Sequence, residues 1–154
     1  MQNIPIDQLF WEIAAIVDKV ILKTNRLIVT GSSSAGKTWM TNNPLVMLAR
    51  FVGRISNNNA SFAFAWMHCV NGRLVYIDEA LVAPETIEKF KNVAGGENTL
   101  IGVKHKALKT IAHKPLIFTA NRPLWEVVKG QSAAIHNRSF CHRVSVSGLS
   151  QNGH

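Results

Sequence analysis

The sequence has few cysteines and no long apolar run, and each of these absences excludes a broad class of protein. Only two of its 154 residues are cysteines, Cys69 and Cys141, which excludes a disulfide-stapled scaffold and favours a reducing compartment. The longest apolar run, residues 61–70, is well below the roughly 18 residues of a membrane-spanning helix. Asp7 and Glu12 interrupt the N-terminal apolar stretch, so a secretory signal is not expected.

Acidic residues are also scarce, with 9 Asp and Glu against 17 Lys and Arg, and the formal net charge is +8. Between residues 89 and 122 one acidic residue, Glu97, stands against seven basic ones. Such a surplus favours a polyanionic partner, either nucleic acid or an acidic membrane surface, and charge alone does not choose between them. The seven are Lys89, Lys91, Lys104, Lys106, Lys109, Lys114 and Arg122.

Apolar patterns predict three helices and four strands. Residues 5–22 carry apolar side chains at spacings of three and four, which indicates a helix. A second helix is expected from Lys37, bent or ended at Asn43–Pro44, and a third over 84–93, ended by Gly95–Gly96. Short β-branched or apolar runs predict strands at 26–30, 74–77, 115–119 and 144–146.

Two further segments are assigned from composition. Residues 53–61 are rich in Asn, Ser and Gly and are expected to form a loop, and 123–129 are expected to form a short helix. The alternation of apolar strands and helices predicts an α/β fold, with a mostly parallel central sheet and helices on both faces.

The most specific motif lies between the first strand and the second helix. It consists of Gly31, Ser32, Ser33, Ser34, Ala35, Gly36, Lys37 and Thr38, and it fits the phosphate-loop pattern G-x-x-x-x-G-K-[ST]. Its glycines let backbone N–H groups curl toward phosphate oxygens, and the helix N-terminus adds partial positive charge. The Lys37 ammonium would reach the β and γ phosphates, and the Thr38 hydroxyl could ligate Mg.

Polar side chains follow the next two strands. Asp78 and Glu79 match the Walker B pattern, in which the first carboxylate holds Mg and the second polarises the attacking water. Asn121 follows the strand at 115–119 and could hold that water or sense the γ-phosphate. By position alone, Asn121 could equally begin a turn.

Residues 99–111 are expected to form a hairpin with Lys104, His105 and Lys106 at its tip. Lys104 and Lys106 are two residues apart and would share a face on a strand. Such a pair suits phosphate contacts, which give salt-dependent and sequence-tolerant binding. A solvated charged turn is the alternative that these residues leave open.

In this order the motifs resemble those of a superfamily 3 helicase, and in particular the ATPase domain of a parvovirus or densovirus non-structural replication protein. The similarity spans roughly Leu27 to Val146. Residues 89–111 look like the family's B′ motif, a DNA-contacting hairpin, and 115–121 look like motif C with Asn121 as its sensor. Phe62-Ala-Phe64 resembles a short aromatic motif of parvoviral proteins. The resemblance implies an AAA+ type P-loop core that uses ATP and Mg.

The resemblance also implies partners. The family acts as a ring, usually a hexamer, with ATP between subunits and an arginine from the next subunit completing each site. Arg138 best matches that arginine, and Arg143 is the second candidate. Single-stranded DNA is the other implied partner, no membrane is involved, and the host cell nucleus is the implied location.

Three divisions of the chain are expected. Residues 1–25 would be a helical lead-in left from an oligomerisation region, 26–147 the ATPase core and 148–154 a flexible tail. Only thirty residues precede Gly31, so the nicking nuclease that such parvoviral proteins carry is expected to be absent.

The sequence therefore predicts the ATP-hydrolysing motor domain of a viral replicative DNA helicase. Glu79 would activate water, Lys37, Asn121 and Arg138 would be the other catalytic residues, and Thr38 and Asp78 would hold Mg. An RNA-directed superfamily 3 helicase is one alternative, because these residues do not distinguish the two sugars. A small P-loop metabolite kinase is another, although no Arg-rich lid is apparent. A nucleotide-gated assembly module without catalysis is the third, and the intact acidic pair argues against it.

Overall fold

The structure is a computed structural model of the chain. It describes residues 4–46, 51–56, 66–79, 92–111, 113–122, 133 and 136–145. The predictions for Phe62–Phe64, for most of the helix at 84–93, for residues 123–129 and for the tail lie outside these residues.

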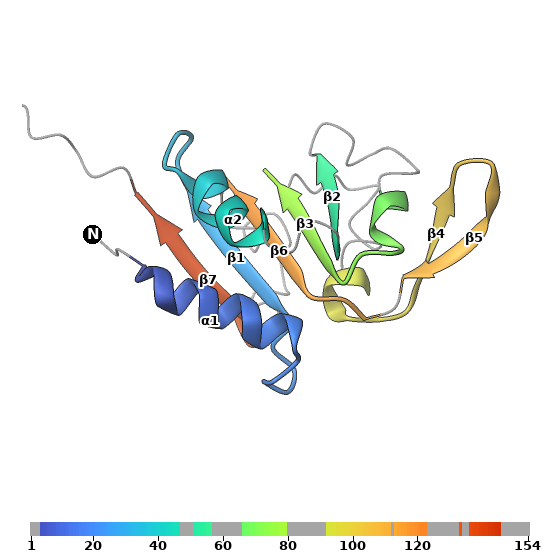
Figure 1. Cartoon of the computed structure of the whole chain (residues 1–154), viewed down its shortest axis with the longest axis horizontal. Helices are drawn as coiled ribbons and strands as arrows, with labels where there is room; N and C mark the ends of the chain where they lie inside the picture. Colours follow the sequence, from blue (N-terminus) through green and yellow to red (C-terminus); the bar gives the residue numbers. More distant parts are fainter. Residues whose placement is uncertain are drawn as a thin grey trace, which may run out of the picture.

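A five-stranded sheet in the order β2-β3-β6-β1-β7 forms the centre of the molecule (Figure 1). All four pairings within it are parallel, so the predicted mostly parallel α/β architecture is confirmed. The central strands are buried along nearly their whole length because both faces of the sheet are covered. The strands are β1 (Arg26–Gly31), β2 (Val52–Ser56), β3 (Leu74–Asp78), β6 (Leu116–Ala120) and β7 (Ser139–Val144).

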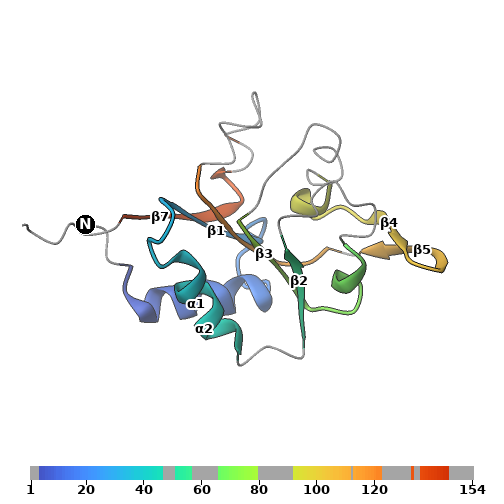
Figure 2. The ribbon, with the colours of Figure 1, turned by 90° about the horizontal axis from the view of Figure 1, so that it is seen from above.

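Alternate residues of these strands supply two separate cores. On one face lie α1 (Ile6–Val17) and α2 (Lys37–Val46), and α1 packs Leu9, Ile13 and Ile16 against β1, β3 and β6 (Figure 2). The opposite face, with Ile28 and Phe118, is covered by Val93, Ala94, the 3₁₀ helix η3 (Met67–Cys69) and the base of a hairpin. No helix in the described ranges is long and apolar enough to cross a membrane.

The hairpin forms a second, two-stranded sheet that extends away from the main one (Figure 1). It consists of β4 (Thr99–Val103) and β5 (Lys106–Ile111), paired antiparallel as the sequence predicts. The helical turn before it ends at Gly96, whose φ of 82° allows Gly96 N–H to bond Val93 O and Glu97 N–H to bond Asn92 O. Ile101 and Ile111 anchor the hairpin to the core.

α1 is shorter than the predicted helix at 5–22. It ends at Val17, and the chain then turns through Lys19, whose φ is 55°. Val20 and Leu22 are therefore not part of the helical stripe, and they are 70% and 86% exposed.

A buried carboxylate joins α1 to the edge strand. Glu12 is 3% exposed, accepts a hydrogen bond from Gln8 at 2.9 Å and lies 2.5 Å from Nε2 of His142 in β7. Residues of the expected lead-in at 1–25 thus pack directly on the sheet.

Three other predicted boundaries are wrong. Residues 53–56 belong to β2, because Gly53 lets the backbone of Cys69 approach: a Cβ there would lie 2.6 Å from Cys69 Cα. α2 does not end at Asn43–Pro44 but continues through Pro44 to Val46, and the proline removes one helix donor there; a bend at Pro44 stays a prediction. The last strand runs from Ser139 to Val144; as a half-buried edge strand paired with β1 it includes His142 and Arg143, so its apolar pattern is weak.

Candidate nucleotide-binding site

The predicted phosphate loop follows β1 directly and ends where α2 begins, so the N-terminus of a ten-residue helix faces the loop. Two glycines have distinct reasons to be there. A Cβ on Gly31 would lie 2.1 Å from the backbone oxygen of Val144 in β7. Gly36 has a φ of 80°, which residues with a side chain rarely adopt.

Lys37 lies inside the loop and is only 5% exposed. Its Nζ donates to the backbone oxygens of Gly31 at 2.9 Å and Ser32 at 2.6 Å, and to Oδ1 of Asn121 at 2.9 Å. These acceptors are neutral, so none of them cancels the positive charge of the ammonium group. The structure thus brings Lys37 and Asn121 together and leaves a buried cation suited to an anionic ligand.

Asp78 is the meeting point of three hydroxyl groups. Its Oδ1 accepts hydrogen bonds from Thr38 at 3.0 Å, Tyr76 at 3.1 Å and Thr119 at 2.8 Å. The predicted pair of Thr38 and Asp78 is therefore in direct contact. A hydroxyl and a carboxylate are hard oxygen ligands of the kind that Mg²⁺ prefers, so the donor set fits this ion. Among the described residues, no group of three His, Cys, Asp or Glu side chains forms a metal site by itself.

Sequence reasoning missed the hydroxyl groups that support Asp78. Tyr76 lies 3.0 Å from the Thr41 hydroxyl, and Thr41 is fully buried and donates to the backbone oxygen of Lys37. Burial raises the pKa of Tyr76 to about 12, and the nearby Asp78 charge acts in the same direction, whereas the Thr41 bond opposes it. The available clue was the position of the only tyrosine, two residues before Asp78 and so on the same strand face.

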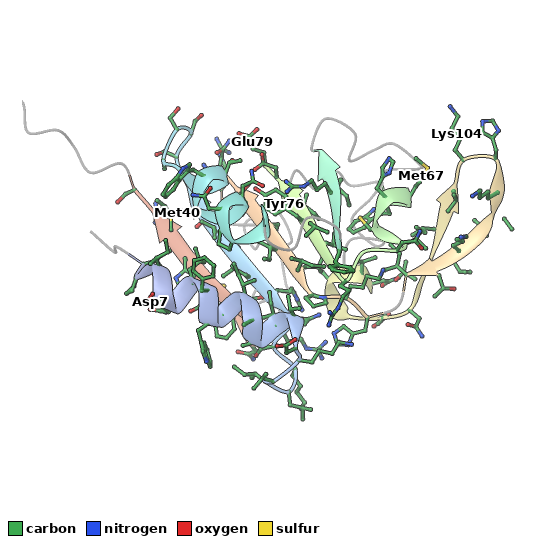
Figure 3. All side chains as sticks on the ribbon, viewed as in Figure 1. Asp7, Met40, Met67, Tyr76, Glu79 and Lys104 are labelled. Atoms are coloured by element: carbon green, nitrogen blue, oxygen red, sulfur yellow. The ribbon has the colours of Figure 1, made fainter. Side chains whose placement is uncertain are left out.

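Glu79 directly follows β3 and is exposed at the sheet edge where α2 begins (Figure 3). Its φ is 50°, an uncommon value for a residue with a side chain. Its backbone N–H donates to the Thr119 hydroxyl at 2.8 Å. Both predicted carboxylates are thus next to the phosphate loop.

Arg138 lies at the opposite end of the sheet from the phosphate loop. It precedes Ser139, which pairs with Arg26 at the start of β1, and its Nη1 donates to Gly95 O at 3.2 Å. Burial lowers the pKa of Arg26 to about 10, and the neighbouring Arg138 charge contributes to this shift. The length of β1, about 16 Å, separates Arg138 from the loop of its own chain.

Arg143, the second candidate, is exposed and pairs with Thr30 near the loop end of β7. It therefore lies at the edge of the sheet that carries the loop of the same chain.

The basic tip lies far from this site. Lys104 and His105 form the turn of the hairpin and Lys106 is the first residue of β5, and all three are exposed. Figure 3 shows Lys104 at the outer end of the hairpin, well away from Glu79. The two lysines thus lie at the tip of the hairpin, as predicted, one in the turn and one at the start of β5.

These features define a class of protein. β1 leads into a phosphate loop, the acidic strand β3 is separated from β1 by β6, and β6 ends beside Asn121. This is a P-loop domain of the AAA+ type. The chain belongs to the parvovirus non-structural protein NS1 family, whose sequence profile matches residues 7–150.

Individual relatives agree with the family. The chain is 27% identical over 133 residues to the initiator protein NS1 of human bocavirus 2, which covers 86% of this chain and 17% of that protein. It is 29% identical over 110 residues to initiator protein NS1 of feline panleukopenia virus, covering 71% and 27%. The chain thus spans a minor part of these relatives.

Solved structures share the fold at low sequence identity. A structure of JCV helicase has a TM-score of 0.64 and 13% identity, with 92% of this chain and 40% of that chain covered. NtrX from Brucella abortus in complex with ADP has a TM-score of 0.54 and 14% identity, covering 88% and 36%. These likenesses show that the chain shares its fold with both structures.

The buried setting of Tyr76 gives a testable prediction. Because the chain has one tyrosine, absorbance at 295 nm should show one phenol titrating near pH 12 in the native protein. In denaturant the same group should titrate near its ordinary pKa of about 10. The folded state binds the proton more tightly, so stability should fall as the pH rises from about 10 toward 12. A native inflection at pH 10 would contradict the burial of the Tyr76 phenol.

Proposed function

We propose that the chain is the ATP-hydrolysing motor domain of a parvoviral replicative DNA helicase. The observation that carries this proposal is the convergence at one sheet edge of a buried lysine bonded to neutral oxygens, an acidic pair and a polar strand end. Lys37 contacts Asn121, and Thr38 contacts Asp78. A cation next to carboxylates suits a triphosphate that arrives with its own metal ion.

Each residue then has a defined task. Lys37 exchanges its bonds to backbone oxygens for bonds to the β and γ phosphates. Asn121, released from Lys37, bonds the γ-phosphate or the attacking water, and Glu79 accepts the proton of that water. Bound Mg would neutralise charge on the phosphates, and Thr38 and Asp78 would hold it.

The names of related proteins support this assignment. The viral relatives are called initiator proteins, and the JCV structure is called a helicase. The NtrX structures contain ADP in one case and ATP in another. We extend a replication role and nucleotide use to this chain on these grounds. A location in the host nucleus is proposed from the family resemblance alone.

The central test separates binding from hydrolysis. Wild type should bind Mg-ATP by calorimetry and release phosphate. Lys37→Ala should weaken binding at least about tenfold, because it removes the cation that meets the phosphates. Glu79→Gln should bind ATP as wild type does and lose about 10²–10⁴-fold in kcat, because the general base is gone.

Glu97→Gln is the matched control, since Glu97 is an exposed carboxylate outside the site, and it should behave as wild type. A folded wild-type protein that binds no ATP would refute the proposal. Full turnover in Glu79→Gln would remove the catalytic role of the acidic pair.

We also propose that Arg138 acts on the nucleotide bound by the next subunit of a ring. Arg138 lies about one strand length from the phosphate loop of its own chain, too far to reach a nucleotide bound there. Its side chain is exposed and can contact a neighbouring subunit. An arginine supplied in this way stabilises charge on the transferring phosphoryl group.

A mixing experiment tests this arrangement. Lys37→Ala and Arg138→Ala should each be inactive alone, because one lacks the phosphate cation and the other the arginine. An equimolar mixture should recover about a quarter of wild-type ATPase activity. In randomly assembled rings, about a quarter of the interfaces combine an intact Lys37 with an intact Arg138 from the neighbour. A mixture with Arg143→Ala in place of Arg138→Ala is the control. If ATPase activity recovered only in the mixture with Arg143→Ala, Arg143 and not Arg138 would be the arginine that acts on the neighbouring site.

We propose that the hairpin tip contacts the backbone of single-stranded DNA. Lys104 and Lys106 are exposed at the outer end of an element that is anchored by Ile101 and Ile111, so their charge is presented on a fixed support. Hydrolysis at the sheet edge would be coupled to motion of this hairpin along the strand. The exposed lysines carry no base-reading geometry, which suits sequence-tolerant binding.

The double variant Lys104→Ala with Lys106→Ala should weaken binding to labelled single-stranded DNA. The slope of log affinity against log salt should shrink by about 1.4, because two phosphate contacts are lost. Lys19→Ala with Lys23→Ala removes the same charge from the region after α1 and should change the slope little. An unchanged slope in the hairpin variant would refute the assignment, and stronger competition by RNA than by DNA would favour the RNA-directed alternative.

A further inference from the structure

We infer that Thr119 is a positioning residue that holds both members of the acidic pair through one hydroxyl group. The inference rests on the proposed function and deepens it, because it says what orients the carboxylates that serve ATP hydrolysis. Thr119 lies in β6 and is completely buried. No step of the mechanism above uses it.

The hydroxyl group bridges two strands where their regular pairing ends. β3 and β6 pair through Ile77 and Phe118, and the next residue on each strand is Asp78 and Thr119. Beyond that pair, Thr119 Oγ1 donates to Asp78 Oδ1 at 2.8 Å and accepts the Glu79 N–H at 2.8 Å. One oxygen thus contacts the side chain of the first acidic residue and the backbone of the second.

The bond to Glu79 has a specific purpose. Glu79 has a φ of 50°, which costs free energy in a residue with a side chain and persists only where the surroundings hold it. The Thr119 hydroxyl fixes the amide at that turn, and so fixes the direction in which the Glu79 side chain leaves the strand.

The bond to Asp78 has another purpose. One of the three donors to Oδ1 is Thr38, the proposed Mg ligand. Its hydroxyl would turn to the metal ion once nucleotide binds, and Asp78 would then depend on the other donors. Thr119 has no such task and keeps Asp78 in place throughout. Thr119 also lies two residues before Asn121, so one strand end aligns the acidic pair and contacts Lys37.

The experiment compares Thr119→Val, which keeps the shape and loses the hydroxyl, with Thr119→Ser, which keeps the hydroxyl. Thr119→Val should lower kcat at least tenfold, while affinity for tripolyphosphate, measured without metal, stays within twofold of wild type. Thr119→Ser should restore kcat to within threefold. Thr99→Val is the matched control, because Thr99 is a buried strand threonine in the hairpin, far from the site, and its hydroxyl donates to Glu97 O.

A second measurement does not depend on activity. In amide hydrogen exchange followed by NMR, the Glu79 N–H should exchange at least tenfold faster in Thr119→Val than in wild type, and Thr119→Ser should protect it. Equal kcat and equal exchange in wild type and Thr119→Val would overturn the inference, as would a Ser variant as impaired as Val. A wild type that hydrolyses no ATP would instead refute the proposed function, and the exchange result would still decide the role of Thr119.

Discussion

The site depends on one carboxylate oxygen. Oδ1 of Asp78 accepts hydrogen bonds from α2 through Thr38, from its own strand through Tyr76 and from β6 through Thr119. Three elements that are distant in sequence are therefore fixed to a single atom. Taking a carboxylate partly out of water is costly unless donors surround it, and here hydroxyl groups supply hydrogen bonds without a competing positive charge. The charge of Lys37 is left for the ligand.

The sequence was most informative where local chemistry demands particular residues. The phosphate loop was predictable because Gly36 needs a positive φ and Lys37 must follow it, and the central strands because they are buried on both faces. The hairpin at 99–111 was expected, and residues 89–111 also resemble a family motif that forms such a hairpin. Asp78 and Asn121 could be placed at one edge because parallel strands end together.

Other parts of the fold could not be predicted because tertiary contacts decide them. β2 has a loop-like composition, and it is a strand only because β3 lies beside it and Cys69 packs against Gly53. The edge strand β7 contains a histidine and an arginine that suggest exposure, although His142 pairs with buried Glu12. The hydroxyl cluster around Asp78 combines Thr41, Tyr76 and Thr119, whose meeting requires the register of three elements.

The contact between Gly31 and Val144 links two sites that the chain itself keeps apart. The phosphate loop begins against the end of β7 with no side chain between the two backbones, and Arg138 stands just before the start of the same strand. A paired strand changes little in length, so the positions of the loop and of the arginine at its two ends are tied to each other. We expect a shift of the loop in one subunit to be felt where that subunit touches its neighbour, without passing through the hairpin or any moving helix.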